Sequence, residues 1–150
     1  MLNRRDLIKY GSAGAAVAVL GVPQLALAET VPTTDDRIKE FTGGAQIGEG
    51  KVSLSTPEIA ENGNTVPVEV SVESPMTAED HVAEVLILAD GNPRPGVATF
   101  KFTEMSGEAF ASTRIRLAMT QDVVAVAKMS DGTFQMARNT VKVTIGGCGG

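Results

Sequence analysis

Alternation of apolar and polar residues is the feature that most constrains the fold of this 150-residue chain. Valine occupies every second position of the segment 66–72, and Val52 and Leu54 show the same spacing earlier. A period of two turns one face of a strand toward a core and the other toward solvent, so both segments are predicted to be half-buried β-strands. The nearly continuous apolar run 82–89 is typical of a central strand.

Further short strands are predicted after the break at 90–96, which is rich in glycine, proline and asparagine. They cover 97–103, 109–117, 123–129, 134–138 and 141–145, and Ser130-Asp131-Gly132 is a hairpin signal. Seven or eight short strands at regular spacing predict an all-β fold, an immunoglobulin-like antiparallel β-sandwich. The Cys-Trp-Cys core of antibody domains is absent from this sequence, which has one cysteine and no tryptophan.

One short helix is predicted ahead of the strands. Residues 33–36, Thr-Thr-Asp-Asp, offer N-cap side chains, and Gly43-Gly44 supplies a stop, so the helix has about two turns. The segment 56–64 has a cap, a proline in the first turn and a closing Asn-Gly, and it is predicted to form one helical turn and a bend.

The first 28 residues have the pattern of a cleaved twin-arginine signal peptide. Arg4 and Arg5 lie in a basic start, a small apolar run follows, and cleavage is expected between Ala28 and Glu29. The run contains glycines and a proline and few large apolar residues, which disfavours a membrane anchor. We therefore expect export of the folded protein to the periplasm, a mature β-sandwich domain over 29–145, and no membrane anchor in the mature form.

The charge of the mature chain argues against nucleic acid as a partner. Without residues 1–28, ten cations and seventeen anions remain, a net charge of −7. This leaves no basic footprint, and aromatic residues that could stack on bases are scarce.

Cys148 is the only cysteine, and glycines surround it at positions 146, 147, 149 and 150. Glycines offer no side chains that could bury the thiol and have the most conformational freedom, so Gly146, Gly147, Gly149 and Gly150 are predicted to form a flexible arm. An extended chain would place the thiol roughly 10 Å beyond the last strand. No cation or histidine beside Cys148 in the sequence favours its thiolate, so a partner has to activate it. We interpret the segment 146–150 as a handle and predict no catalytic residue in this chain.

Other candidate sites are weaker. His81 is the only histidine, and zinc or copper sites need more ligands, so a solvated loop residue is expected. The methionines at 76, 105, 119, 129 and 136 are interpreted as packing residues. Ser112-Thr113 has no histidine base for a catalytic triad. No metal site is predicted.

The C-terminal sequence from Val141 to Gly150 resembles that of the SoxY family, the sulfur-carrier subunits of the bacterial thiosulfate-oxidising (Sox) system. The resemblance extends over nearly the whole mature chain, through 57–63, 66–68, 74–77, 92–93 and 112–118, and includes the twin-arginine signal.

The resemblance implies that Cys148 carries sulfur intermediates covalently, first as an S-thiosulfonate and then as a persulfide, with no other cofactor. It implies a heterodimer with a SoxZ-like subunit. The enzymes that would act on Cys148 are a c-type cytochrome that couples thiosulfate, a hydrolase that releases sulfate and, where present, a sulfane-oxidising enzyme.

Two alternatives follow from the residues. The sandwich could be a structural or interaction module in which Cys148 only forms an interchain disulfide, because an odd cysteine and exposed strand edges suit such a module. A metal-binding role would rest on His81 and the methionines.

Overall fold

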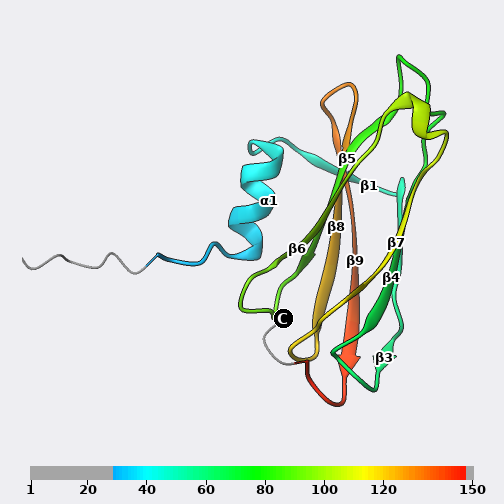
Figure 1. Cartoon of the computed structure of the whole chain (residues 1–150). Coiled ribbons are helices and arrows are strands. Elements are labelled where there is room, and N and C mark those ends of the chain that lie inside the picture. The colour runs from blue at the N-terminus through cyan, green and yellow to red at the C-terminus, as the bar shows by residue number, and fades with distance from the viewer. Residues whose placement is uncertain (1–28, 148–150) are drawn as a thin grey trace, which may run out of the picture.

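The computed structural model describes residues 29–147, which form two β-sheets and one α-helix (Figure 1). The helix is α1 (Thr34–Thr42), and a short 3-10 helix is η1 (Glu104–Ser106). The strands are β1 (Ile47–Glu49), β2 (Val52–Ser55), β3 (Ile59–Ala60), β4 (Val66–Val72), β5 (Val82–Ala89), β6 (Gly96–Lys101), β7 (Ala109–Ile115), β8 (Gln121–Met129) and β9 (Phe134–Val143).

The two sheets lie face to face. The larger has the strand order β1-β9-β8-β5-β6, with β3 also paired to β9, and the smaller has the order β2-β4-β7. All pairings are antiparallel except those of β1 and β3 with β9, which are parallel. The predicted immunoglobulin-like sandwich with a short N-terminal helix is therefore confirmed, and its two parallel pairings are an addition to the antiparallel arrangement.

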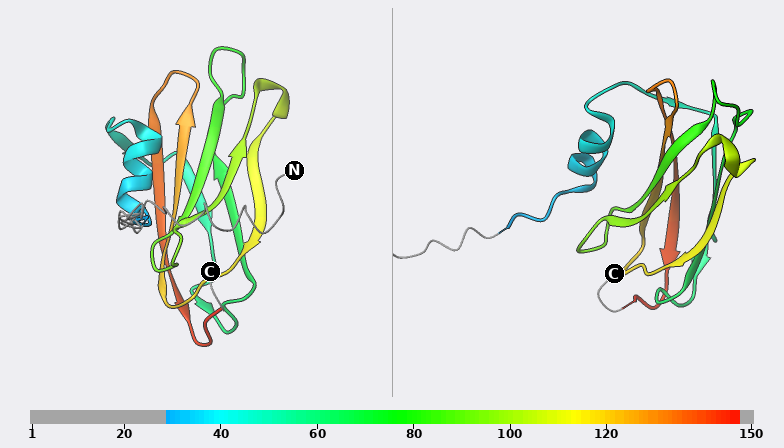
Figure 2. Two further views of the ribbon diagram at one scale, coloured as in Figure 1. Left: turned by 60° about the vertical axis from the view of Figure 1, so that its left-hand side comes forward. Right: turned by 45° about the horizontal axis from the view of Figure 1, so that its top comes forward.

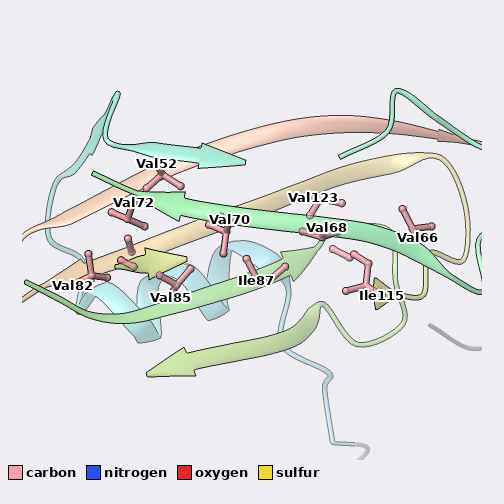
Figure 3. Close-up of a cluster of buried hydrophobic side chains, with 14 of the residues drawn as sticks. Val52, Val66, Val68, Val70, Val72, Val82, Val85, Ile87, Ile115 and Val123 are labelled. Carbon is pink, nitrogen blue, oxygen red and sulfur yellow. The ribbon is translucent and has the colours of Figure 1, made fainter. Parts of the chain in front are cut away.

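The main core fills the space between the sheets. Figure 3 shows the valines of β4 facing Val82, Val85 and Ile87 of β5 and Val123 of β8. The burial pattern of β4 alternates along the strand, as its sequence predicted, because only one face of the smaller sheet meets the core.

Helix α1 covers part of the outer face of the larger sheet, as the two views in Figure 2 show. Ile38 and Phe41 of the helix pack on a second apolar cluster of Leu86, Leu88, Val124, Val126 and Phe134. The middle of β5 and of β8 is thus buried on both faces, which explains their continuous apolar runs.

The ends of α1 lie close to where the sequence placed them. The Thr33 side chain accepts a hydrogen bond from the backbone amide of Asp36, and the Asp36 carboxylate accepts from the amide of Thr33. Gly43 ends the helix with φ of 64°, a left-handed conformation that glycine adopts readily.

Two local predictions were wrong. The segment 56–64 forms no helical turn, because Ile59–Ala60 is extended and pairs with β9. Residues 134–143 form one strand instead of two, because side-chain hydrogen bonds hold the polar residues at its middle in the sheet. Asn139 donates to the carbonyl of Leu54 at 2.6 Å, and Thr140 donates to the carboxylate of Asp122 at 2.6 Å.

No helix within residues 29–147 is long and apolar enough to cross a membrane.

Candidate functional site at the C-terminal end

The predicted site residues divide between two regions of the chain. Cys148, Gly149 and Gly150 lie outside the described residues, as do Arg4, Arg5 and Ala28 of the predicted signal. Glu29 is the first described residue and is exposed. Gly146 and Gly147 are described, so the structure shows how the chain reaches the residue before the cysteine.

Three backbone segments meet just beyond the end of β9, near the end of the molecule where β3 lies (Figure 1). The amide of Gly63 donates to the carbonyl of Ile145 at 2.7 Å, the amide of Leu117 donates to the carbonyl of Gly63 at 2.8 Å, and the amide of Gly147 donates to the carbonyl of Leu117 at 2.8 Å. We call Gly63, Leu117 and Gly147 the tail clamp. All three are buried, so the chain is fixed up to the residue before Cys148.

Three positions in and next to the tail clamp, 63, 146 and 147, require glycine for steric reasons. A Cβ on Gly63 would lie 2.3 Å from the carbonyl oxygen of Leu117, and one on Gly147 would lie 2.7 Å from that of Gly63. A Cβ on Gly146 would lie 2.2 Å from the carbonyl oxygen of Ala118. Because these neighbours are backbone atoms, no side-chain rotation relieves the clash. The glycines at 146 and 147 therefore allow close approach of the chain.

A buried pair of side-chain amides, Asn92 and Gln121, supports the loop after β7 that contains Leu117. Asn92 donates to the carbonyl of Arg116 at 2.8 Å and accepts from the amide of Ala118 at 3.0 Å. Gln121 donates to the side-chain oxygen of Asn92 at 2.9 Å and accepts from the amide of Gly91 at 2.8 Å. Buried polar groups that are hydrogen-bonded in this way rigidify the loop that they contact.

The end of β9 is also held on its other sides. The hydroxyl of Thr120 accepts from the amide of Val143 at 2.9 Å, and the hydroxyl of Thr144 donates to the carbonyl of Glu61 at 3.0 Å. The amide of Thr144 donates to the carbonyl of Ala60 at 3.1 Å. The segments 60–63, 117–120 and 143–147 thus lie side by side.

This arrangement shortens the predicted flexible arm. The sequence predicts that the arm begins at Gly146. In the structure, however, Gly146 packs against Ala118, and Gly147 is buried and hydrogen-bonded. Both are part of the folded domain, so the domain continues past the predicted boundary at 145/146 and includes Gly147. Sequence reasoning missed Gly63 because Asn62-Gly63-Asn64 is a turn pattern, and nothing local in it indicates contact with residues 117 and 147.

Two large apolar side chains that follow or precede a clamp residue closely in the sequence are exposed to solvent. Met119 is 55% exposed and Ile145 is 69% exposed, and each lies two residues from a member of the clamp. We call this pair the rim. Of the other four expected packing methionines, Met76 and Met129 are buried and Met136 packs on the second cluster, whereas Met105 is 87% exposed.

The remaining candidate residues form no site that the structure describes. His81 is partly exposed, and its Nδ1 lies 2.9 Å from the carbonyl oxygen of Thr77. Among residues 29–147, no three His, Cys, Asp or Glu side chains are grouped so that they could hold a metal ion.

A charged group close to the clamp ties β8 to β9. The carboxylate of Asp122 accepts hydrogen bonds from the hydroxyl of Thr140 at 2.6 Å and from Arg138 at 3.2 Å. These two hydrogen bonds, that of Thr140 first, lower the pKa of Asp122 below its usual value of 3.8. Asp122 follows Gln121, so this pairing reinforces the same end of the sheet.

Comparison with known proteins identifies the family. The family model of sulfur oxidation protein SoxY matches residues 38–148. The chain is similar to the solved structure of the sulfur carrier protein SoxY from Chlorobium limicola f thiosulfatophilum, with 33% identity and a TM-score of 0.63, over 77% of this chain and 100% of that one. No curated protein sequence matches.

A more distant likeness is to the superoxide reductase (neelaredoxin) from Ignicoccus hospitalis. It has 18% identity and a TM-score of 0.57, over 63% of this chain and 80% of that one, and at this identity it shows a shared fold alone. The SoxY model, in contrast, covers most of the chain and extends to the cysteine that follows the tail clamp. This chain belongs to the sulfur oxidation protein SoxY family.

Proposed function

We propose that this chain is a carrier that holds sulfur intermediates of thiosulfate oxidation on Cys148 and presents them to partner enzymes. Membership of the SoxY family supports the carrier role, since the relative from Chlorobium limicola is described as a sulfur carrier protein. The observation that carries the proposal is that the lone cysteine directly follows Gly147 in the sequence, and Gly147 is hydrogen-bonded within the folded domain.

The first step would load Cys148. A bond forms between Sγ of Cys148 and the sulfane sulfur of thiosulfate, the thiol proton passes to solvent or to the partner, and two electrons pass to a c-type cytochrome. The product is the S-thiosulfonate, a disulfide-like adduct that ends in a sulfonate group.

The second step would release sulfate. Water attacks the sulfonate sulfur in the active site of a hydrolase, the bond between that sulfur and the sulfane sulfur breaks, and its electron pair stays on the sulfane sulfur. Two protons leave, and Cys148 keeps a persulfide, the reversible cysteine modification that a sulfane-oxidising enzyme could then oxidise. In both steps this chain provides Sγ of Cys148 as the attachment atom, and the partner enzyme catalyses the oxidation or the hydrolysis.

The proposal includes a SoxZ-like subunit as heterodimer partner and export to the periplasm by the twin-arginine route. Membership of the SoxY family supports the first of these, and the Arg4-Arg5 pair supports the second.

Intact-mass measurement tests the function. The heterodimer is incubated with thiosulfate, the coupling cytochrome and an electron acceptor, and the wild-type chain should gain the mass of one thiosulfate group. Addition of the hydrolase should reduce the gain to one sulfur atom. The control Cys148→Ser should gain nothing and should stop thiosulfate turnover. If Cys148→Ser left turnover intact, the cysteine would serve only as an interchain link and the carrier role would be wrong.

A further inference from the structure

We infer that the rim, Met119 and Ile145, is the surface on which the enzyme that couples thiosulfate to Cys148 docks. The inference rests on the proposed function and adds to it where on this chain that enzyme binds. Its basis is the tail clamp, which limits how far the cysteine can be from the folded domain.

The clamp sets a short distance between the thiol and the domain surface. Consecutive Cα atoms are about 3.8 Å apart, and a cysteine side chain adds roughly 3 Å, so Sγ of Cys148 stays within about 7 Å of the Gly147 Cα. Gly147 is itself buried and hydrogen-bonded to Leu117. A protein that encloses Sγ must therefore approach the domain surface around Gly147 closely enough to touch it.

Two exposed apolar side chains lie on the backbone segments that meet at that point. Ile145 lies on the segment that ends in Gly147, and Met119 lies on the neighbouring segment, where Gly146 packs on Ala118. Both side chains are more than half exposed, although an isoleucine and a methionine gain by leaving water. Methionine is flexible and polarizable, and it is common on surfaces that bind more than one partner, as a carrier must.

The position of the rim also separates it from Met105, the most exposed large apolar side chain among residues 29–147. Met105 is more exposed than either rim residue, but it belongs to η1, the yellow-green turn near the top of Figure 1, at the opposite end of the sandwich from the end of β9. An enzyme that binds Cys148 is therefore not expected to contact Met105. Met105 is therefore a matched control for Met119.

Steady-state loading of Cys148 tests the inference. The concentration of the heterodimer is varied at a fixed concentration of the coupling enzyme, and the rate of adduct formation on Cys148 is measured by intact mass. Met119→Ser and Ile145→Ser should each raise KM for the carrier roughly fivefold to tenfold and leave kcat unchanged, since a central apolar contact is worth about 1 kcal/mol. Met105→Ser should leave both constants at the wild-type values.

Two further readouts make the result specific. Alkylation of Cys148 by iodoacetamide should proceed at the wild-type rate in all three variants, which shows that the thiol itself is unchanged. An unchanged KM in both rim variants, or an equal rise in Met105→Ser, would overturn the inference while wild-type loading upheld the carrier role. Dissociation of the heterodimer by the rim variants would also overturn it, because the rim would then belong to the subunit interface. Failure of the wild-type chain to load would instead contradict the proposed function.

Discussion

The substitution Gly63→Ala tests whether the tail clamp exists as described. The added Cβ would lie 2.3 Å from the carbonyl oxygen of Leu117 and 2.7 Å from the amide nitrogen of Gly147, so the three segments have to separate. Separation breaks the hydrogen bonds from Leu117 to Gly63 and from Gly147 to Leu117. At about 1 kcal/mol each, with added strain, the loss is roughly 2 to 3 kcal/mol of unfolding free energy.

Thermal unfolding followed by circular dichroism measures this loss. For a domain of this size, 2 to 3 kcal/mol corresponds to a fall in Tm of roughly 10 °C. Amide hydrogen exchange adds a local readout, since the amide of Gly147 should lose its protection even at temperatures where the core of β5 and β8 stays protected.

Gly96→Ala is the matched control. Its nearest neighbour would be the end of the Arg37 side chain at 3.2 Å, which can move aside, and so its Tm should stay close to that of the wild type. If Gly63→Ala unfolded at the wild-type temperature and kept Gly147 protected, the steric argument for the clamp would be refuted.

Three other substitutions test the supports of the fold and the site. Asn92→Ala removes three hydrogen bonds around the 116–118 segment and should cost roughly 2 to 3 kcal/mol in urea unfolding, with faster exchange of the Gly147 amide. Ile87→Val, at a fully buried position of the main core, should cost about 1 kcal/mol in the same measurement. The pKa of Asp122 is lowered in the folded state. The contribution of the Asp122 carboxylate to stability is therefore fully present above pH 3.8, the ordinary pKa, and is lost as the pH falls through the folded pKa. Asp122→Asn should therefore unfold at a lower Tm near neutral pH and show a shallower loss of stability below about pH 4, and an unchanged acid profile would contradict this assignment.

The sandwich could be predicted from the sequence because its signals are local. The alternating valines of β4 indicate that one face of the strand is buried, and the continuous apolar run of β5 indicates that both faces are buried. The capping residue Thr33 and the terminal Gly43 likewise act within their own helix.

The site could be predicted only in part, because its geometry depends on contacts between distant segments. The glycines around Cys148 were visible as composition, and flexibility was the only interpretation that local sequence offered. The role of Gly146 depends on its contact with Ala118, and the role of Gly147 depends on Leu117 and Gly63, which lie 30 and 84 positions away in the sequence. The extended Ile59–Ala60 was missed for the same reason, since β9 supplies its partner groups.

The pairing of β9 has a mechanical consequence under the proposed function, in which partner enzymes bind the C-terminal end of the chain. This strand is bonded to β8 along one edge and to β1 and β3 along the other. A pull on the C terminus acts along β9, so its hydrogen bonds with the strands on both edges are loaded together in shear and are not opened one by one. The tail clamp lies between the point of pulling and the strand. The hydrogen bond from Gly147 to Leu117 adds to this resistance, so a partner that binds Cys148 would pull on the sandwich as a whole and the thiol would stay close to the folded domain.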